Sequence, residues 1–131
     1  MFDVGSIIIK KKLVFKEKGE LDHAYKKGRP CLVIALDDEY YYYLSISRSI
    51  KNHSKTEIHS PKFTKPSSPS FNNIFKSPIC FKEEIDKVPV KKMLIIYKTL
   101  IKYYSKRKKC ENYNEVIEYI KNYIKENEKE M

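Results

Sequence analysis

Two short stretches of this chain place phosphate-binding residue types at the ends of apolar runs. Gly-Arg-Pro at 28–30 leads into one apolar run, and four tyrosines at 40–43 begin another that ends in Ser-Arg-Ser at 47–49. The chain has 24 lysines but only three arginines, and two of the three are Arg29 and Arg48. A guanidinium holds a phosphate with two parallel donors, which a lysine ammonium does not. These positions predict a phosphate site where the two runs meet.

Residues near these arginines can supply the steps of an RNA cleavage that needs no metal ion. The 2′-hydroxyl must attack the adjacent phosphate, the developing charge must be neutralised, and the leaving 5′-oxygen must gain a proton. A histidine such as His53 can move a proton near neutral pH. An exposed tyrosine ring can stack an unpaired base. The catalytic candidates are Ser47, Arg48, Lys51 and His53, and the RNA-binding candidates are Arg29, Lys27, Ser49, Lys55, Tyr41 and Tyr43.

The same residue types also have structural interpretations. Serine is common where a strand turns, and Arg29 can serve to position the turn ahead of Pro30. A histidine in a polar loop is commonly a surface residue. His23, beside Asp22, can form either a proton-transfer pair or a hydrogen bond that fixes a loop. The four tyrosines suit a half-buried strand as well as a platform for a base.

Composition indicates one basic domain. The 131 residues suffice for one domain and 41% apolar content supports a core. The net charge is +10, and because residues 110–131 carry six Glu and three Lys, residues 1–109 carry +13. A basic body favours a polyanionic partner, since neutralising phosphates releases counterions. Abundant Lys, Ile, Asn and Tyr are also typical of an AT-rich genome, so charge by itself leaves the partner open.

Cysteine spacing and the N-terminus indicate the compartment. Cys31, Cys80 and Cys110 are odd in number and widely spaced, which suits a reducing cytoplasm and forms no metal-binding pair. Asp3 stands where a signal peptide carries a basic region, and no apolar run approaches the roughly 20 residues of a membrane span. With three glycines in the chain, a phosphate-cradling glycine loop is not expected. We therefore expect a cytoplasmic protein without a membrane segment, metal or cofactor.

The first half of the chain predicts strands. A β-branched run predicts a strand at 4–9, which the lysines at 10–12 extend along an exposed edge. Residues 16–28 are polar and predict a loop. The runs 31–36 and 40–47, separated by an acidic turn, predict a hairpin. On its second arm one face is predicted to carry Tyr40, Tyr42, Leu44 and Ile46, and the other Tyr41, Tyr43, Ser45 and Ser47.

The second half predicts helices after a long polar loop at 48–70. Two short strands at 71–76 and 78–81, or one strand broken at Pro78, follow this loop. Pro89 opens a predicted helix whose apolar stripe is Val90, Met93, Leu94, Tyr97, Leu100, Ile101 and Tyr104. A second helix is predicted to begin near Asn112, with Glu115 completing a capping box, and to fray after Lys125. Strands followed by helices predict one α+β domain over 1–131, a small antiparallel β-barrel covered by two C-terminal helices.

This order of elements resembles the MazF/PemK/CcdB-type barrel of bacterial toxins. The second half is similar to the type III toxins, the ToxN, AbiQ and CptN group, through Ile-Phe-Lys-Ser-Pro-Ile at 74–79 and Val-Pro-Val-Lys-Lys-Met-Leu at 88–94. Tyr-Lys-Thr-Leu at 97–100 belongs to the same match. Within that group, Leu-Asp-His at 21–23 and Gly-Arg-Pro at 28–30 are most similar to CptN. The resemblance covers most of residues 4–124.

The resemblance implies a sequence-selective endoribonuclease that leaves 2′,3′-cyclic phosphate and 5′-hydroxyl ends. Its implied substrates are mRNA and the precursor of its own antitoxin RNA. The implied inhibitor is a small repeated RNA, expected to be pseudoknotted, with which the toxin assembles into a ring or compact complex. Family members carry a Thr/Ser-Ser-x-Lys-like step after the hairpin strand, which residues 47–51 match best at Ser47. Because Arg48 departs from that pattern, Arg48 and Lys51 both qualify as the catalytic cation, and Arg29 matches the basic residue before the apolar strand.

Two other functions remain open from the sequence. One is a type II relative on the same barrel, which dimerises and pairs with a protein antitoxin. The other is a non-catalytic RNA-binding module, in which the basic helix face and the loop bind RNA without cutting it.

Overall fold

The computed structural model describes residues 3–14, 21–47, 54–61, 63, 67–80 and 83–128. Within these residues six strands form an antiparallel sheet in the order β4-β3-β2-β1-β6, with β5 pairing β3. The strands are β1 (Ser6–Val14), β2 (Leu21–Leu36), β3 (Tyr40–Ser47), β4 (Ser68–Pro69), β5 (Phe75–Pro78) and β6 (Asp86–Lys87). A short turn of 3-10 helix, η1 (Ser54–Thr56), precedes β4, and two helices, α1 (Val90–Ser105) and α2 (Tyr113–Glu128), complete the chain.

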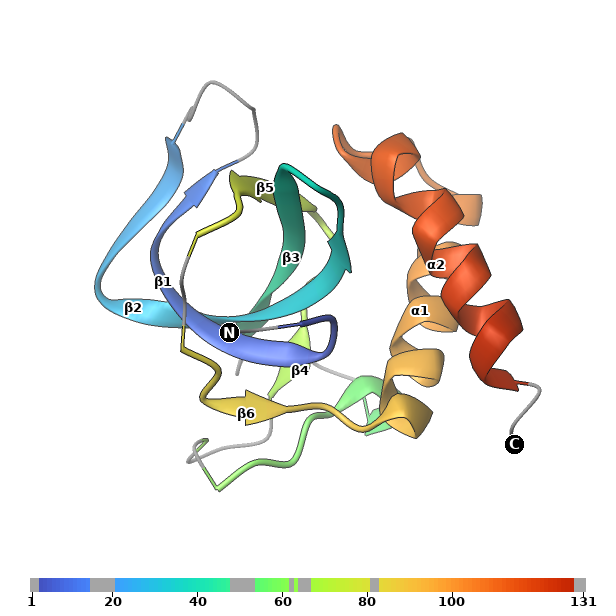
Figure 1. Ribbon diagram of the computed structural model, residues 1–131, viewed down its shortest axis with the longest axis horizontal. Coiled ribbons are helices and arrows are strands. Elements are labelled where there is room, and N and C mark those ends of the chain that lie inside the picture. Colours follow the sequence, from blue (N-terminus) through green and yellow to red (C-terminus); the bar gives the residue numbers. More distant parts are fainter. Residues whose placement is uncertain are drawn as a thin grey trace.

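The sheet curls into a half-barrel, and both helices lie against one side of it (Figure 1). The curl brings β5, which pairs with β3, into contact with β1. The α+β prediction and the two C-terminal helices are therefore confirmed. The two helices cover the outer, convex face of the β2–β3 hairpin, and the inner, concave face is closed by the curl itself.

The strand β2 is longer than the sequence predicts. Residues 21–28 were expected in a loop, but they continue β2 and pair with β1, where Lys12 lies opposite Ala24 and Leu13 opposite His23. Polar residues with weak strand propensity form a strand here because the neighbouring strand supplies hydrogen-bond partners to their backbone. The expected loop is thus wrong over this part. Irregularities in the register between Lys10 and Lys12 and between Leu13 and Val14 bend the pair.

Alternation along the hairpin divides the interior into two cores. Tyr42, Leu44 and Ile46 belong to the large core under the helices. Tyr41 and Tyr43 point to the concave face, in a second core with Ile8, Cys31, Val33 and Phe75. The predicted alternation on β3 is therefore confirmed, and both of its faces are buried, because curling turns the second face inward instead of leaving it exposed to solvent.

The helix α1 uses most of the predicted stripe. Met93, Leu94, Tyr97, Leu100 and Tyr104 are buried. Ile96 is also fully buried, whereas Val90, predicted in the stripe, is 45% exposed because it is the first residue of the helix. The Tyr97 hydroxyl donates to the Ile34 carbonyl oxygen at 2.6 Å, which fixes α1 against β2.

Three local predictions need correction. Two strands at 71–76 and 78–81, or one strand broken at Pro78, were expected, and the described residues form one shorter strand, β5, whose residues 75–78 pair with Tyr40–Tyr43 of β3. The described part of the long loop holds η1 and β4, and Ile58 in it is buried. The Glu115 carboxylate does not close a capping box but accepts hydrogen bonds from Tyr42 and Lys76. β3 pairs with β5 and β4 and carries Tyr42, whereas η1 packs against α1 and β4.

Candidate anion site on the concave face

The hairpin brings Arg29 and Ser47 to the same end of the sheet. The β2–β3 ladder pairs Cys31 with Ser45. Arg29 and Ser47 lie two residues beyond this pair on their strands, so they share its face and stand at the end of the hairpin opposite the turn. Both are partly exposed. The two positions that the sequence predicts at one phosphate site therefore lie on neighbouring strands at the mouth of the concave face.

Other predicted site residues are described only in part or not at all. Arg48, Ser49, Lys51 and His53 lie outside the described residues. Lys27 belongs to β2, but its side chain is outside the described part. Lys55 lies in η1 with an exposed side chain, and its carbonyl oxygen accepts a hydrogen bond from the Lys92 ammonium at 3.2 Å.

Tyr41 and Tyr43 are not placed to stack a base. Both side chains have 0% exposure. Their ring centroids lie 5.2 Å apart, and the Tyr43 ring stacks on Phe75 at 5.6 Å. A base needs an exposed ring face, so this placement argues against the predicted stacking role. The physical reason is the curl of the sheet, which packs these rings against the other strands.

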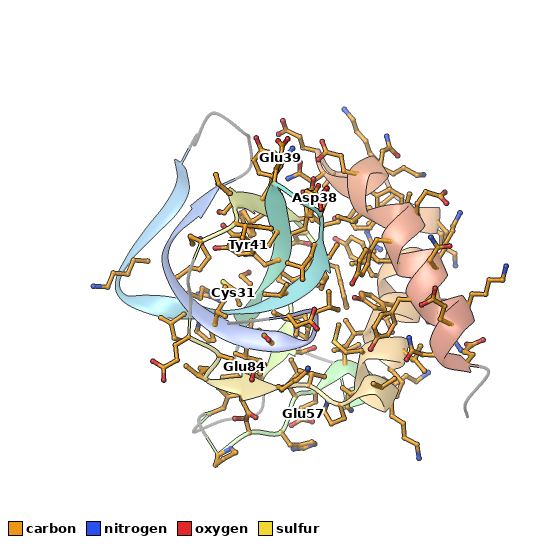
Figure 2. All side chains as sticks on the ribbon, in the orientation of Figure 1. Cys31, Asp38, Glu39, Tyr41, Glu57 and Glu84 are labelled. Carbon is orange, nitrogen blue, oxygen red and sulfur yellow. The ribbon has the colours of Figure 1, made fainter. Side chains whose placement is uncertain are left out.

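A buried lysine, which the sequence interpretation missed, joins the concave face. Lys10 was expected on an exposed edge, but it is only 9% exposed. Its ammonium donates to the Tyr41 hydroxyl at 2.5 Å and to Ser77 Oγ at 3.3 Å, and it lies 5.0 Å from the centroids of both the Tyr41 and Tyr43 rings. Figure 2 shows Tyr41 and Cys31 inside the curl of the sheet. Strand alternation could have predicted this position, because Lys10 lies two residues after the apolar Ile8 and therefore shares its face of the sheet.

The pairing of β1 with β2 sets two cations opposite each other. Lys10 and Arg29 are directly paired in the ladder, so their side chains leave the same face of the sheet. Two cations in this position raise the positive potential on this face of the sheet, which attracts an anion. We therefore regard Lys10, Arg29, Ser45 and Ser47 as the candidate anion site.

The tyrosine beside Lys10 is a neutral hydroxyl at physiological pH. Burial, with a smaller contribution from Tyr43, raises the pKa of Tyr41 well above its ordinary value of 10. Tyr43 in turn shares a hydrogen bond of 3.0 Å with Ser77. The Tyr41 and Ser77 hydroxyls hold the Lys10 ammonium in place, and the neutral Tyr41 hydroxyl is not a proton acceptor for a reaction near neutral pH.

Small hydroxyl residues fix the end of β3. Ser47 pairs with Ser68 of β4, and Ser70 donates its amide to the Ser45 carbonyl oxygen at 2.8 Å. Ser68 Oγ shares a hydrogen bond of 2.5 Å with Thr56 Oγ1, and both side chains are buried. The residue before it, Ser67, forms a bridge with Ile58. The 54–58 segment is thereby attached to the strand that ends in the candidate site.

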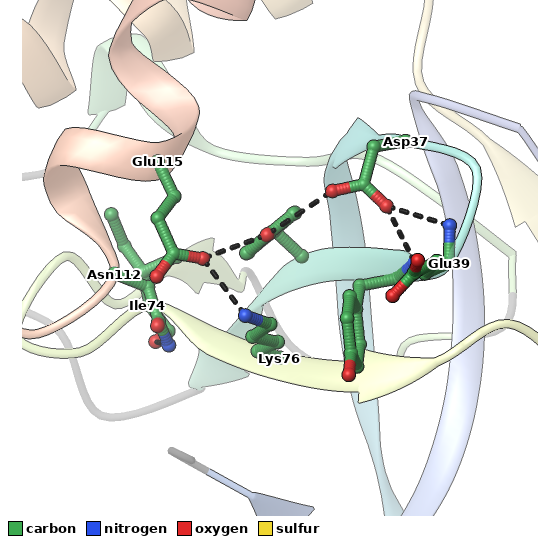
Figure 3. Close-up of polar contacts among 8 residues, drawn as sticks. Asp37, Glu39, Ile74, Lys76, Asn112 and Glu115 are labelled. Carbon is green, nitrogen blue, oxygen red and sulfur yellow. Dashed lines mark hydrogen bonds and ion pairs between the residues drawn. The ribbon is translucent and has the colours of Figure 1, made fainter. Parts of the chain in front are cut away.

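A different polar cluster joins the hairpin turn to α2 (Figure 3). The Tyr42 hydroxyl lies 2.8 Å from Glu115 Oε2 and 3.3 Å from Asp37 Oδ2. The Lys76 ammonium lies 3.0 Å from the same Glu115 oxygen. Burial acts to raise the pKa of Asp37. Hydrogen bonds from the Tyr40 and Glu39 amides, with smaller contributions from Tyr42 and Lys76, together outweigh burial, so the pKa of Asp37 is lowered. These contacts hold the first turn of α2 against the sheet.

Within the described residues, no three His, Cys, Asp or Glu side chains gather closely enough to hold a metal ion. Neither α1 nor α2 has the length and apolar content that a bilayer crossing requires. A scan against protein-family models, a search of curated proteins and a search of solved structures each found no match to this chain. The case for a function therefore depends on the geometry of the site.

Proposed function

We propose that this protein is a metal-independent endoribonuclease toxin of the type III kind, built on a MazF/PemK/CcdB-like barrel. The observation that carries the proposal is the strand register, which pairs Lys10 with Arg29 and sets Arg29 and Ser47 two residues beyond the Cys31–Ser45 pair on the same face. The net charge of +10 supports a polyanionic substrate. Its substrates are mRNA and an antitoxin RNA precursor, and the mature small RNA inhibits it in a toxin–RNA complex.

The proposed reaction is an internal transfer of the phosphoryl group. The 2′-oxygen loses its proton and bonds to the adjacent phosphorus, the bond from phosphorus to the 5′-oxygen breaks, and the 5′-oxygen gains a proton. The products are a 2′,3′-cyclic phosphate and a 5′-hydroxyl. Arg29 binds the non-bridging oxygens with its two parallel donors, and the Ser47 hydroxyl donates to them. Lys10, behind Arg29, adds positive potential where charge develops.

The proton transfers are assigned to residues that follow Ser47 in the sequence. Histidine is the residue type suited to moving a proton near neutral pH, so this role is assigned to His53, and Arg48 or Lys51 supplies the second cation. The Tyr41 hydroxyl is excluded as a base, because burial raises its pKa above the ordinary value.

The test is an RNA-cleavage assay with mapped product ends, carried out with Arg29→Met and Ser47→Ala. We expect each variant to lose about 10²–10³-fold in cleavage rate, the usual effect of removing one group that stabilises the transition state. Arg107→Met is the matched control, since Arg107 is exposed and its guanidinium lies 4.1 Å above the Tyr103 ring. Wild-type rates in both site variants would disprove this site.

The same assay separates the other two functions. Tight binding of RNA that stays intact would indicate a binding module and overturn the enzyme proposal. Cleavage that a protein antitoxin inhibits, and that no small repeated RNA inhibits, would indicate the type II relative. Binding of the antitoxin RNA should weaken steeply as salt is added, because its contacts are mostly to phosphates.

A further inference from the structure

A small pocket lies where three segments of the chain meet, β1, the 58–59 segment and the stretch from β6 to the start of α1. Its volume is about 140 Å³. Ile7, Ile58 and Val88 line it and are buried. Pro89, His59, Lys87 and Lys92 also line it, and of these Lys92 is partly exposed and the others are exposed. The pocket therefore has an apolar floor and a mainly cationic rim.

The one carboxylate of the pocket is already engaged by the protein. Asp86 accepts hydrogen bonds from the Ser60 hydroxyl and from the Lys87 backbone amide at Oδ1. These contacts join the 58–60 segment to β6. On the opposite side, the Lys92 ammonium donates to the Lys55 carbonyl oxygen. The three segments are thus held together by hydrogen bonds, and Lys87, Lys92 and His59 remain on the rim for a ligand to meet.

The shape and charge of this pocket favour a single nucleotide. A volume of about 140 Å³ lies well below the roughly 300 Å³ of pockets that bind drug-sized molecules, so it admits one planar ring and no helix or folded peptide. The apolar floor, Pro89 and the imidazole of His59 offer faces on which a base can stack. Lysine ammonium groups on the rim can hold the attached phosphate.

The strand pairing places this pocket near the proposed cleavage site. Ser47 pairs with Ser68, and the neighbouring Ser67 bridges to Ile58 in the pocket wall. Two successive strand spacings separate Ser47 from Ile58, which corresponds to about 10 Å. An RNA strand with one phosphate at Ser47 can therefore reach the pocket with a nucleotide close by in its sequence.

We propose that this pocket binds one nucleotide flanking the cleaved bond and contributes to the sequence preference of the enzyme. The proposal rests on the function inferred above, because it takes RNA as the substrate. The base occupies the apolar floor, and its phosphate is bound by Lys92 and Lys87.

A direct binding measurement on the full chain tests this proposal. Titration with nucleoside 5′-monophosphates, followed by NMR or calorimetry, should give saturable binding. Lys92→Met should weaken it roughly tenfold or more, the effect of losing one charge-assisted hydrogen bond. Lys91→Met is the matched control, because Lys91 is the adjacent exposed lysine of α1 and does not line the pocket. His59→Gln, at an exposed position, is a second variant that should weaken binding without affecting folding.

Three outcomes would overturn the proposal. Equal weakening by Lys91→Met and Lys92→Met would show a general charge effect. Inorganic phosphate that binds as tightly as the nucleotides would show that no base is recognised. An acidic peptide that displaces the nucleotide with higher affinity would identify a protein partner instead.

Cleavage assays separate a failure of the pocket from a failure of the proposed enzyme. If both proposals hold, Lys92→Met changes the preferred cleavage positions in long RNA, whereas Lys91→Met, outside the pocket, leaves them as in the wild type. If the protein cuts no RNA but binds nucleotides in a Lys92-dependent manner, the enzyme proposal fails and nucleotide recognition stands. Cleavage with unaltered preference in Lys92→Met and His59→Gln would overturn the pocket proposal only.

Discussion

The two faces of β3 carry the same residue type in opposite electrostatic surroundings. On the convex face the Tyr42 hydroxyl lies between the carboxylates of Asp37 and Glu115. On the concave face the Tyr41 hydroxyl accepts a hydrogen bond from the Lys10 ammonium. One tyrosine is a donor to anions and the next is an acceptor from a cation, although they are adjacent in the sequence. The face that a side chain occupies therefore decides its role.

The two faces also differ in what their polar groups are paired with. On the convex face, the carboxylate of Glu115 meets the Lys76 ammonium, so the opposite charges stabilise the contact between α2 and the sheet. On the concave face, two cations, Lys10 and Arg29, lie opposite each other in one ladder. Opposite charges in contact are typical of a structural role, whereas two cations facing each other in one ladder raise the local positive potential, which attracts an anion.

The largest expected effect concerns packing and is the same on both faces. Tyr43→Ala on the concave face and Leu44→Ala on the convex face should each lower the free energy of unfolding by about 3–5 kcal/mol, since both side chains are fully buried. Denaturant titration of both variants measures this. A loss below about 1 kcal/mol in Tyr43→Ala alone would show that the concave side is not a packed core.

Alkaline pH should destabilise both faces. Burial raises the pKa of Tyr41 and of Tyr42 above the ordinary value of 10, and Glu115 adds to the shift at Tyr42. Above about pH 10 the unfolded chain releases these phenolic protons while the folded protein retains them, so stability falls as the pH rises. Unfolding measured at several pH values should show this decline, and Tyr42→Phe should make it shallower. An unchanged decline in Tyr42→Phe and in Tyr41→Phe would contradict the burial of both phenols.

Removing the Glu115 carboxylate from the polar cluster on the convex face should lower stability moderately. Glu115→Gln should lower the free energy of unfolding by about 1 kcal/mol, because the carboxylate accepts two hydrogen bonds but is partly exposed to solvent. A double-mutant cycle with Tyr42→Phe should give a coupling energy of about 0.5 kcal/mol or more. Additive effects of the two substitutions would show that the hydroxyl and the carboxylate do not interact.

Removing the charge of Lys10 on the concave face should have the smallest effect on stability and should weaken RNA binding. Lys10→Met keeps the length of the side chain and removes a buried charge opposite Arg29, so we expect a stability change within about 1 kcal/mol. RNA affinity should fall, and the slope of affinity against salt should become shallower by about one charge. A loss of stability larger than that of Glu115→Gln, with unaltered RNA affinity, would reverse the roles assigned to the two faces.

Local patterns in the sequence predicted several elements of the fold. The hairpin of β2 and β3 with its acidic turn, the alternation of the four tyrosines and both helices followed from periodicity alone. At the candidate site, the position of Arg29 near the end of β3 followed from the hairpin, whose ladder ends at the pair of Cys31 and Ser45. The burial of Lys10 was missed because a run of three lysines predicts a solvent-exposed edge unless the register with β2 is known. Tyr41 and Tyr43 were assigned to RNA because an alternating strand does not reveal whether its second face is covered.

Local sequence patterns were enough to predict which segments form strands and which form helices, because strand alternation and helical stripes depend on residues only a few positions apart. Tertiary structure alone decided that β2 extends back to Leu21, that Lys10 faces Arg29 and that Glu115 contacts Tyr42 instead of capping its own helix. The physical reason is the same in each case. Strand register and sheet curvature arise from backbone pairing between distant segments, and they set which side chains share a buried face.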